Sequence, residues 1–161
     1  MSEITFVLLK PDAIERKLVR EIISYFADYN IFPKLFDLQT ATAEKITAHY
    51  AEHIKKFGIE FELESRIMFE GKAVIPIVLA GSNDIIQSVR NIVGATEPSK
   101  AEHGTIRGDL GKGDNYEKAD LEHRLVANLI HASDSEMAVK REIGIWLPDF
   151  HFDSCEKEAR Q

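Results

Sequence analysis

The sequence predicts an α+β fold organised as one domain. Short runs of β-branched and aromatic residues alternate with amphipathic patterns, in the order strand, helix, strand, helices, strand, helix, long loop, strand, helix. The chain of 161 residues, 44% apolar and 29% charged, is long enough to bury a core without disulfides or a structural metal. No internal repeat, low-complexity segment or linker interrupts this order. Residues 1–161 are therefore expected to form a single domain.

The first half of the chain is expected to supply two strands and three helices. Residues 4–9 form an apolar run typical of a buried strand, which ends at Lys10. Apolar residues on one helical face then predict a helix, namely Leu18, Val19, Ile22, Ile23 and Phe26. A second strand is expected over residues 33–41, followed by a helix with Thr42 as its N-cap and a more acidic helix over residues 60–69.

The second half begins with a strand over residues 73–80 that contains Pro76. Because proline cannot donate a ladder hydrogen bond, we expect an edge, a bulge or a local kink there. The next helix is expected to be capped by Asn83 or Asp84 and to end at Gly94.

Residues 95–124 then lose all periodicity and are rich in glycine and charge, which predicts a long functional or irregular loop. Residues 125–130 indicate a short strand. Ser133-Asp134-Ser135-Glu136 has the pattern of a capping box before a helix that runs through Ile145, and a polar tail is expected over residues 151–161.

Charge and composition narrow the range of partners and compartments. The 20 basic and 27 acidic residues give a net charge of −7 and no basic stripe, so no nucleic acid partner is expected. No apolar stretch approaches the roughly 20 residues that span a bilayer, and no signal-peptide pattern is present, so no membrane association is expected. The single cysteine, Cys155, fits a reducing compartment and a cytoplasmic location.

His131 is the first candidate for chemistry. It is expected to close the 125–130 strand just before a helix N-terminus, where free backbone N–H groups and the helix dipole favour an anion. A histidine there could carry a phosphoryl group. On these residues alone, a histidine that simply bonds to a nearby carbonyl is the favoured interpretation.

Several cations could accompany this histidine. Lys10 ends a buried strand, where its ammonium would point into a crevice or else extend to solvent. Gly104 and Gly108 bracket Arg107, which predicts a tight loop that presents a guanidinium suited to phosphate. Two further residues, Arg90 and Thr96, are ambiguous when taken singly.

Common alternative motifs are missing from the sequence. There is no Walker A loop, no dinucleotide-binding glycine motif, no nucleophile elbow, no zinc-protease motif and no C-x-x-C pair. His49 and His53 are spaced i, i+4, but Tyr50 stands where a zinc protease needs glutamate. These two histidines are therefore interpreted as a surface pair.

Four segments together resemble the nucleoside diphosphate kinase family. They are Thr5 to Asp12 (TFVLLKPD), Gly94 to Pro98 with Gly104 to Asp109 (GATEP and GTIRGD), Asn128 to Ser135 (NLIHASDS), and Glu142 to Trp146 (EIGIW). They follow the family's order and span nearly the whole chain. Agreement of all four by chance is very improbable.

The resemblance implies a ferredoxin-like βαββαβ sandwich, a four-stranded antiparallel sheet covered by helices, with a long nucleotide-binding loop. It implies transfer of the γ-phosphate of ATP or another nucleoside triphosphate to a nucleoside diphosphate, through phosphohistidine at His131. Mg²⁺ would be held through the nucleotide phosphates and not by protein ligands. By family analogy Glu142 orients His131, Ser133 bonds to Glu142, and the nucleotide is held by Lys10, Tyr50, Phe61, Arg90, Thr96, Arg107 and Asn128.

Departures from the family pattern concern the base contact and the assembly. Phe61 is the expected stacking residue, with Phe57 as the alternative. Residues 110–124, which we call the inserted segment, make the loop about a dozen residues longer than in the family, at little cost in closure entropy. A homo-oligomer with a dimer as its unit is expected, whereas the inserted segment and Ala127, where the family often has arginine, place the usual hexamer contact in doubt.

Two rival functions remain at this point. A non-catalytic nucleotide-binding or protein-interaction module on the same fold would predict loss of a chemical residue, and none is lost. A phosphohydrolase that uses His131 as nucleophile and water as acceptor would share the same residues.

Overall fold

The structure is a computed structural model that describes residues 3–82 and 84–152. Asn83, one of the two candidate caps, lies outside the described residues, as do Cys155 and most of the expected polar tail. None of the helices in the described ranges is long and apolar enough to cross a membrane.

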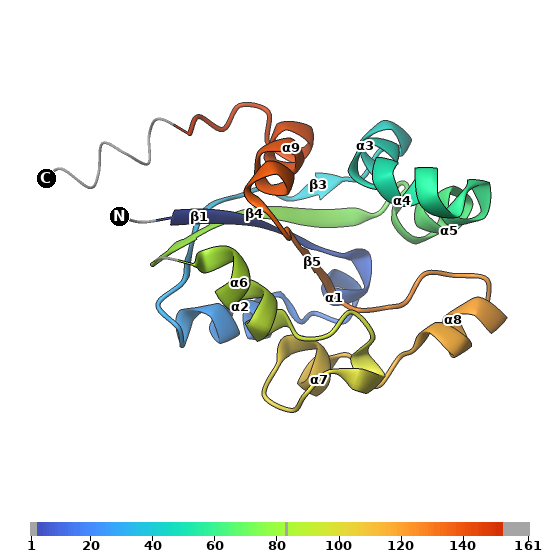
Figure 1. Ribbon diagram of the computed structural model, residues 1–161, viewed down its shortest axis with the longest axis horizontal. Coiled ribbons are helices and arrows are strands. Elements are labelled where there is room, and N and C mark those ends of the chain that lie inside the picture. Colours follow the sequence, from blue (N-terminus) through green and yellow to red (C-terminus); the bar gives the residue numbers. More distant parts are fainter. Residues whose placement is uncertain (1–2, 83, 153–161) are drawn as a thin grey trace, which may run out of the picture.

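The centre of the fold is an antiparallel sheet (Figure 1). β1 (Glu3–Leu9) lies between β4 (Ala73–Gly81) and β5 (Ile130–Ala132), and β4 also pairs with β2 (Phe32–Phe36) and the two-residue β3 (Gln39–Thr40). The main strand order is β2-β4-β1-β5, with β3 beside β4. In chain order, helices follow β1 and β4, as in the ferredoxin-like βαββαβ order that the resemblance implied. Further helices lie between β3 and β4.

Helices cover both faces of the sheet (Figure 1). One face carries α1 (Pro11–Glu15), α2 (Val19–Ala27), α6 (Ile85–Val93) and α7 (Ile106–Leu110). The opposite face carries α3 (Ala43–His49), α4 (Ala51–Phe57), α5 (Ile59–Phe69) and α9 (Glu136–Trp146). The 3-10 helix η1 (Pro98–Lys100) and α8 (Tyr116–Leu121) belong to the long connection before β5.

The two covered faces explain why β1 is a continuous apolar run without alternation. Val7 and Leu9 enter the core cluster beneath α2 and α6, while Phe6 and Leu8 enter the cluster beneath α3, α5 and α9. Successive side chains of a strand point to opposite faces, so a strand buried on both faces needs apolar residues at every position.

The predicted strand over residues 33–41 is divided into β2 and β3. Its partner β4 contains Pro76, whose carbonyl accepts a hydrogen bond from the Asp37 amide (3.2 Å). Pro76 has no N–H to offer on that side, so the ladder is interrupted there and the register also shifts between Pro33 and Leu35. The expectation of a local irregularity at Pro76 is confirmed.

The helix after Thr42 starts as predicted but is shorter than expected. The Thr42 hydroxyl accepts a hydrogen bond from the Lys45 amide, which confirms the N-cap. The backbone then leaves helical geometry at Tyr50 (φ −97°, ψ 14°), so α3 and α4 are separate helices. His49 and His53 therefore stand on different helices, and the i, i+4 argument does not apply to them.

The interpretation of residues 95–124 as a loop without regular structure is wrong. The connection contains η1, α7 and α8, and the inserted segment forms α8 with the Asn115 side chain as its N-cap. Gly94 ends α6 as predicted, at φ 87°. Arg107, expected in a tight loop, lies inside α7, because the Thr105 side chain caps that short helix.

The strand predicted over residues 125–130 is also misplaced, because β5 starts only at Ile130. Leu129 adopts φ 70°, a left-handed conformation that no strand residue can hold. Its amide donates to the Asp12 carboxylate (3.0 Å), and its carbonyl accepts from the Lys10 amide (2.9 Å). These two bonds hold the turn, and His131 lies in the middle of β5 as a result.

The capping box is shifted by two residues from its predicted position. Ser135 is the N-cap of α9 and accepts from the Ala138 amide (3.2 Å). The Ser133 hydroxyl is turned inward instead, toward Glu142. Ser133 therefore belongs to the site and not to the helix end.

Candidate active site

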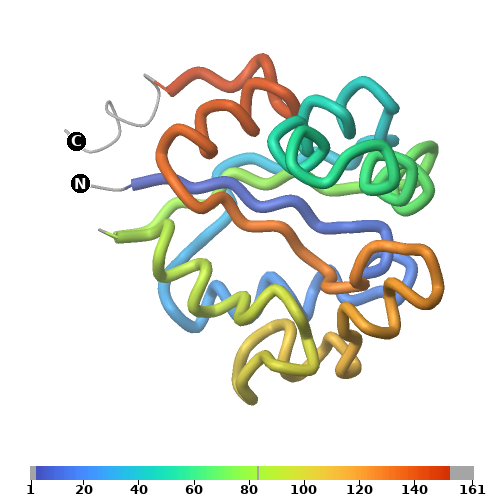
Figure 2. The backbone as a smooth tube through the Cα atoms, turned by 45° about the vertical axis from the view of Figure 1, so that its right-hand side comes forward, coloured from blue at the N-terminus to red at the C-terminus, as the bar shows by residue number. Residues whose placement is uncertain are grey.

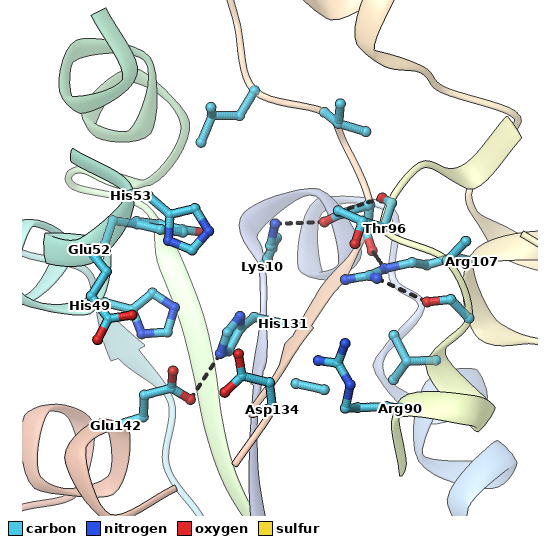
Figure 3. Close-up of a pocket in the computed structure, with 18 of the residues that line it drawn as sticks. Lys10, His49, Glu52, His53, Arg90, Thr96, Arg107, His131, Asp134 and Glu142 are labelled. Carbon is cyan, nitrogen blue, oxygen red and sulfur yellow. Dashed lines mark hydrogen bonds and ion pairs between the residues drawn. The ribbon is translucent and has the colours of Figure 1, made fainter. Parts of the chain in front are cut away.

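A pocket of about 350 Å³ lies where the α3–α5 helices, the end of β1, β5 and the long connection meet. Figure 3 shows its labelled side chains converging from these elements. Every nucleotide-site residue expected from the sequence lines it except Ser133, which lies directly behind Glu142: Lys10, Tyr50, Phe61, Arg90, Thr96, Arg107, Asn128, His131 and Glu142. Segments far apart in the chain thus form one polar cleft.

His131 is held at one ring nitrogen. Its Nε2 lies 2.9 Å from Oε2 of Glu142, and the Ser133 hydroxyl donates to the same oxygen at 2.6 Å. A carboxylate partner assigns the proton to Nε2 and leaves Nδ1 with a free lone pair when the ring is neutral. The rest of the ring points into the pocket below Lys10 (Figure 3).

Glu142 remains a carboxylate despite its burial. Burial alone would raise the pKa of this carboxyl group, but the hydrogen bonds from His131 and Ser133 outweigh burial and hold the pKa below its usual value. Arg141 adds a contact to the other oxygen at 3.3 Å. Glu142 therefore acts as a charged acceptor that can stabilise positive charge on the imidazole.

Lys10 is buried at the end of β1, with only 6% of its surface exposed. Its Nζ donates to Oδ1 of Asn128 at 2.6 Å, and the Asn128 amide donates to the Thr96 carbonyl at 2.8 Å. The alternative in which Lys10 extends to solvent is wrong. Burial, together with the positive charge of Arg107, lowers the pKa of Lys10 to about 8.

The lowered pKa of Lys10 gives a testable pH dependence. For the activity that the resemblance implies, we expect kcat/KM to fall as the pH rises through about 8, because the free protein then loses the charge on Lys10. The unfolded chain keeps that proton to higher pH, so the free energy of unfolding should rise over the same interval. Steady-state kinetics of Lys10→Arg should lack this alkaline limb; a limb that persists in the variant would assign it to another group.

Arg107 is anchored by backbone carbonyls. Its guanidinium donates to the carbonyl oxygens of Asn128 (3.1 Å), Gly94 (3.1 Å) and Ile130 (2.5 Å). Burial lowers its pKa to about 10, so it stays charged near neutral pH. A guanidinium has five N–H donors, which leaves donors available for a ligand in the pocket.

Two of the remaining predicted residues are polar groups at the rim. Arg90 and Thr96 are exposed and line the pocket. On the other wall, Tyr50 is buried, and burial followed by the Glu142 charge raises its pKa. Phe61 stacks on the His53 ring (5.5 Å between centroids, 19° between planes) and lines the pocket, whereas the alternative Phe57 lies outside its lining.

Sequence reasoning missed His49, which is not a surface residue. Its side chain is 4% exposed and its ring lies edge-on to His131 at 4.5 Å. The Trp146 indole donates to Nδ1 of His49 at 3.2 Å, and burial followed by the charge of His131 holds the pKa of His49 well below its usual value. His49 is therefore a neutral ring that packs beside His131. Only its contact with Trp146, a distant residue, could have revealed this.

The pocket can stabilise an anion next to an oriented imidazole. Three cations, Lys10, Arg90 and Arg107, lie around the part of the cleft that His131 faces (Figure 3). Donors that the fold already holds in place stabilise negative charge without having to reorganise. The geometry suits transfer of a group that carries several anionic oxygens.

Comparison with known proteins agrees with this geometry. The sequence model of the family described as "Nucleoside diphosphate kinase" matches residues 3–152. A nucleoside diphosphate kinase of Nocardioides sp. is 40% identical over 148 residues, covering 92% of this chain and 98% of the relative. That of Nocardia farcinica is 36% identical over 153 residues, covering 93% and 98%.

Solved structures share the fold of this chain. A transition-state mimic of nucleoside-diphosphate kinase from Borrelia burgdorferi with bound vanadate and ADP superposes with a TM-score of 0.85 at 26% identity, covering 96% of each chain. An NDP kinase from Pyrobaculum aerophilum gives a TM-score of 0.81 at 31% identity, covering 95% of this chain and 98% of that one.

Fold, pocket and relatives together define a nucleotide-binding phosphotransferase. The chain belongs to the nucleoside diphosphate kinase family, and its activity is the transfer of phosphate to nucleoside diphosphates.

Proposed function

We propose that the chain transfers the γ-phosphate of a nucleoside triphosphate, typically ATP, to a second nucleoside diphosphate through phosphohistidine at His131. The observation that carries this proposal is the 2.9 Å contact between Nε2 of His131 and Glu142, which leaves Nδ1 for the pocket. A covalent relay allows one pocket to serve both nucleotides in turn.

In the first half-reaction the Nδ1 lone pair attacks the γ-phosphorus, the bond to the bridging oxygen breaks, and the nucleoside diphosphate leaves with that electron pair. The imidazole becomes positively charged, and Glu142 stabilises this charge through Nε2–H. In the second half-reaction a terminal phosphate oxygen of another diphosphate attacks the same phosphorus, and neutral His131 is restored.

Roles for the other residues follow from their chemistry. Lys10, Arg90 and Arg107 offset the charge that moves between the bridging oxygen and the transferred group. The Asn128 amide and the Thr96 hydroxyl can bond to sugar and phosphate oxygens. Tyr50 offers its hydroxyl to the phosphates, and Phe61 offers a ring to the base.

The pocket residues fit a Mg²⁺ ion that arrives on the nucleotide. Among the acids that line it, Glu142 is bonded to His131 and Ser133, and Glu52 to Arg141, while Asp134 lies exposed at the rim. Mg²⁺ prefers oxygen ligands and keeps several waters, so phosphate oxygens would be its main ligands, with Asp134 as the available carboxylate. When bound, Mg²⁺ supplies charge neutralisation to the phosphates.

Incubation with ATP labelled in the γ-phosphate tests the proposal. We expect an acid-labile, alkali-stable phosphoprotein whose label passes to added GDP. Label that appears as free phosphate faster than it reaches GDP would instead support a phosphohydrolase. An enzyme that never carries label while it transfers phosphate would contradict the relay.

We also propose that the chain forms homodimers in the cytoplasm. β2 lies at one edge of the sheet and presents exposed apolar side chains from Phe32, Leu35 and Phe36, with Leu38 following. Proteins usually cover such an edge, and the β2 edge of a second copy would do so. Sedimentation of the wild type and of Phe36→Lys should give a dimer and a monomer; a wild-type monomer would contradict this.

A further inference from the structure

The inserted segment contributes directly to the pocket wall. Tyr116, the first residue of α8, lines the pocket together with Leu125 and Val126, which follow the segment. Figures 1 and 2 both place this orange part of the chain at the same end of the molecule as α4 and α5. The pocket therefore has Phe61 of α5 on one side and Tyr116 of α8 on another.

The backbone at Tyr116 makes polar contacts with the preceding connection. Its amide donates to Glu97 (3.4 Å), a buried carboxylate that also accepts from Ser99 and Lys100. The preceding Asn115 caps α8 through the Lys118 amide (2.8 Å). The start of α8 is thus fixed to the connection that carries Thr96.

A bidentate ion pair between Asp114 and Arg124 joins the two sides of the inserted segment. The Arg124 guanidinium donates to both carboxylate oxygens of Asp114, at 2.7 and 2.8 Å, and Asp114 also accepts from the Ala127 amide at 2.8 Å. Paired donors of this kind fix geometry as well as charge. Because Ala127 precedes Asn128, the same carboxylate joins the inserted segment to the group that binds Lys10.

This part of the lining adds aromatic and aliphatic side chains to the cations of the pocket, and Tyr116 lies near enough to Arg107 to influence the pKa of that guanidinium. Tyr116, Leu125 and Val126 present a ring and two aliphatic side chains, which suit the flat, apolar faces of a base and sugar better than phosphate. Tyr116 is 49% exposed without ligand, so its ring has surface left to cover.

We propose that Tyr116 contacts the nucleoside part of the bound nucleotide, on a different wall from Phe61. This inference rests on the proposed function, because it assumes that the nucleotide's phosphates lie near His131. Tyr116 is then a binding residue that the inserted segment adds to this pocket.

The test compares Tyr116→Ala with Leu121→Ala, a matched control on the same helix whose side chain is 77% exposed and lies outside the pocket lining. Equilibrium binding of ADP and of inorganic tripolyphosphate is measured by calorimetry for both variants and the wild type. We expect Tyr116→Ala to weaken ADP binding by about 5- to 20-fold, as loss of an aromatic contact to a base does, with tripolyphosphate unchanged. KM for ADP should rise while kcat at saturation stays near that of the wild type.

Other outcomes overturn the inference. If Tyr116→Ala binds ADP as tightly as Leu121→Ala does, Tyr116 makes no contact. If tripolyphosphate binding falls as much as ADP binding, Tyr116 contacts the phosphate groups and not the nucleoside. A wild-type protein that binds neither ADP nor tripolyphosphate would overturn the proposed function as well, which separates that failure from the other two.

Discussion

Replacing His131 by glycine is expected to lower phosphotransfer by about 10⁵-fold or more, since the variant lacks the proposed nucleophile and the covalent route with it. The fold should survive, because His131 is only partly buried and its neighbours in β5 carry the core contacts. A coupled assay of ATP and GDP measures the loss, and thermal unfolding reports on the fold.

The matched control for this variant is His123→Gly, an exposed histidine whose φ of 50° glycine tolerates well. It should keep wild-type activity. Added imidazole should restore part of the activity to His131→Gly, because the small ring can occupy the space left beside Glu142. Activity of His131→Gly above about 1% of wild type without imidazole would show that His131 is not the nucleophile.

Arg107→Ala is expected to lose both activity and stability, whereas Lys10→Met should lose activity alone. Removal of the guanidinium takes a donor from three carbonyl oxygens, of which those of Asn128 and Ile130 are buried, and should cost about 2–4 kcal/mol of unfolding free energy. In the proposed mechanism both residues stabilise charge on the transferred phosphate, so kcat should fall about 10²- to 10³-fold in each variant.

The contrast with Lys10 comes from desolvation. Burial lowers the pKa of Lys10 to about 8, which shows that the folded state disfavours its charged form. Lys10→Met removes this buried charge but also the hydrogen bond to Asn128 (2.6 Å), and because the two effects oppose each other the unfolding free energy should change little. Urea titration beside steady-state kinetics separates the two effects. Equal losses of unfolding free energy in the two variants would contradict the claim that Arg107 stabilises the fold through its backbone hydrogen bonds while the buried charge of Lys10 does not.

The sequence was sufficient for elements whose cause is local. The apolar run of β1, the helical face of α2, the Thr42 cap and the Gly94 terminus all depend on neighbouring residues, and the structure has them where they were predicted. The gathering of Lys10, Arg107 and Asn128 into one cleft was expected only through the family resemblance, because more than 100 residues separate Lys10 from Asn128.

Features that depend on distant partners were mispredicted or missed. The strand over residues 125–130 was expected from its composition, but the Asp12 carboxylate holds Leu129 in a turn. His49 was expected at the surface, but it is buried and accepts a hydrogen bond from Trp146, which is distant in the sequence. The inserted segment was expected to be irregular because its sequence has no periodic pattern. Its structure depends instead on the ion pair between Asp114 and Arg124 and on the hydrogen bond from Tyr116 to Glu97, which no periodic pattern indicates.

The most direct test of the central claim is the position of the phosphate on the imidazole of the phosphorylated enzyme, read by ³¹P NMR of the protein after reaction with ATP. Because Nε2 is bonded to Glu142, we expect Nδ1-phosphohistidine at residue 131 as the only covalent species. A resonance of Nε2-phosphohistidine, or phosphate on another residue, would contradict it.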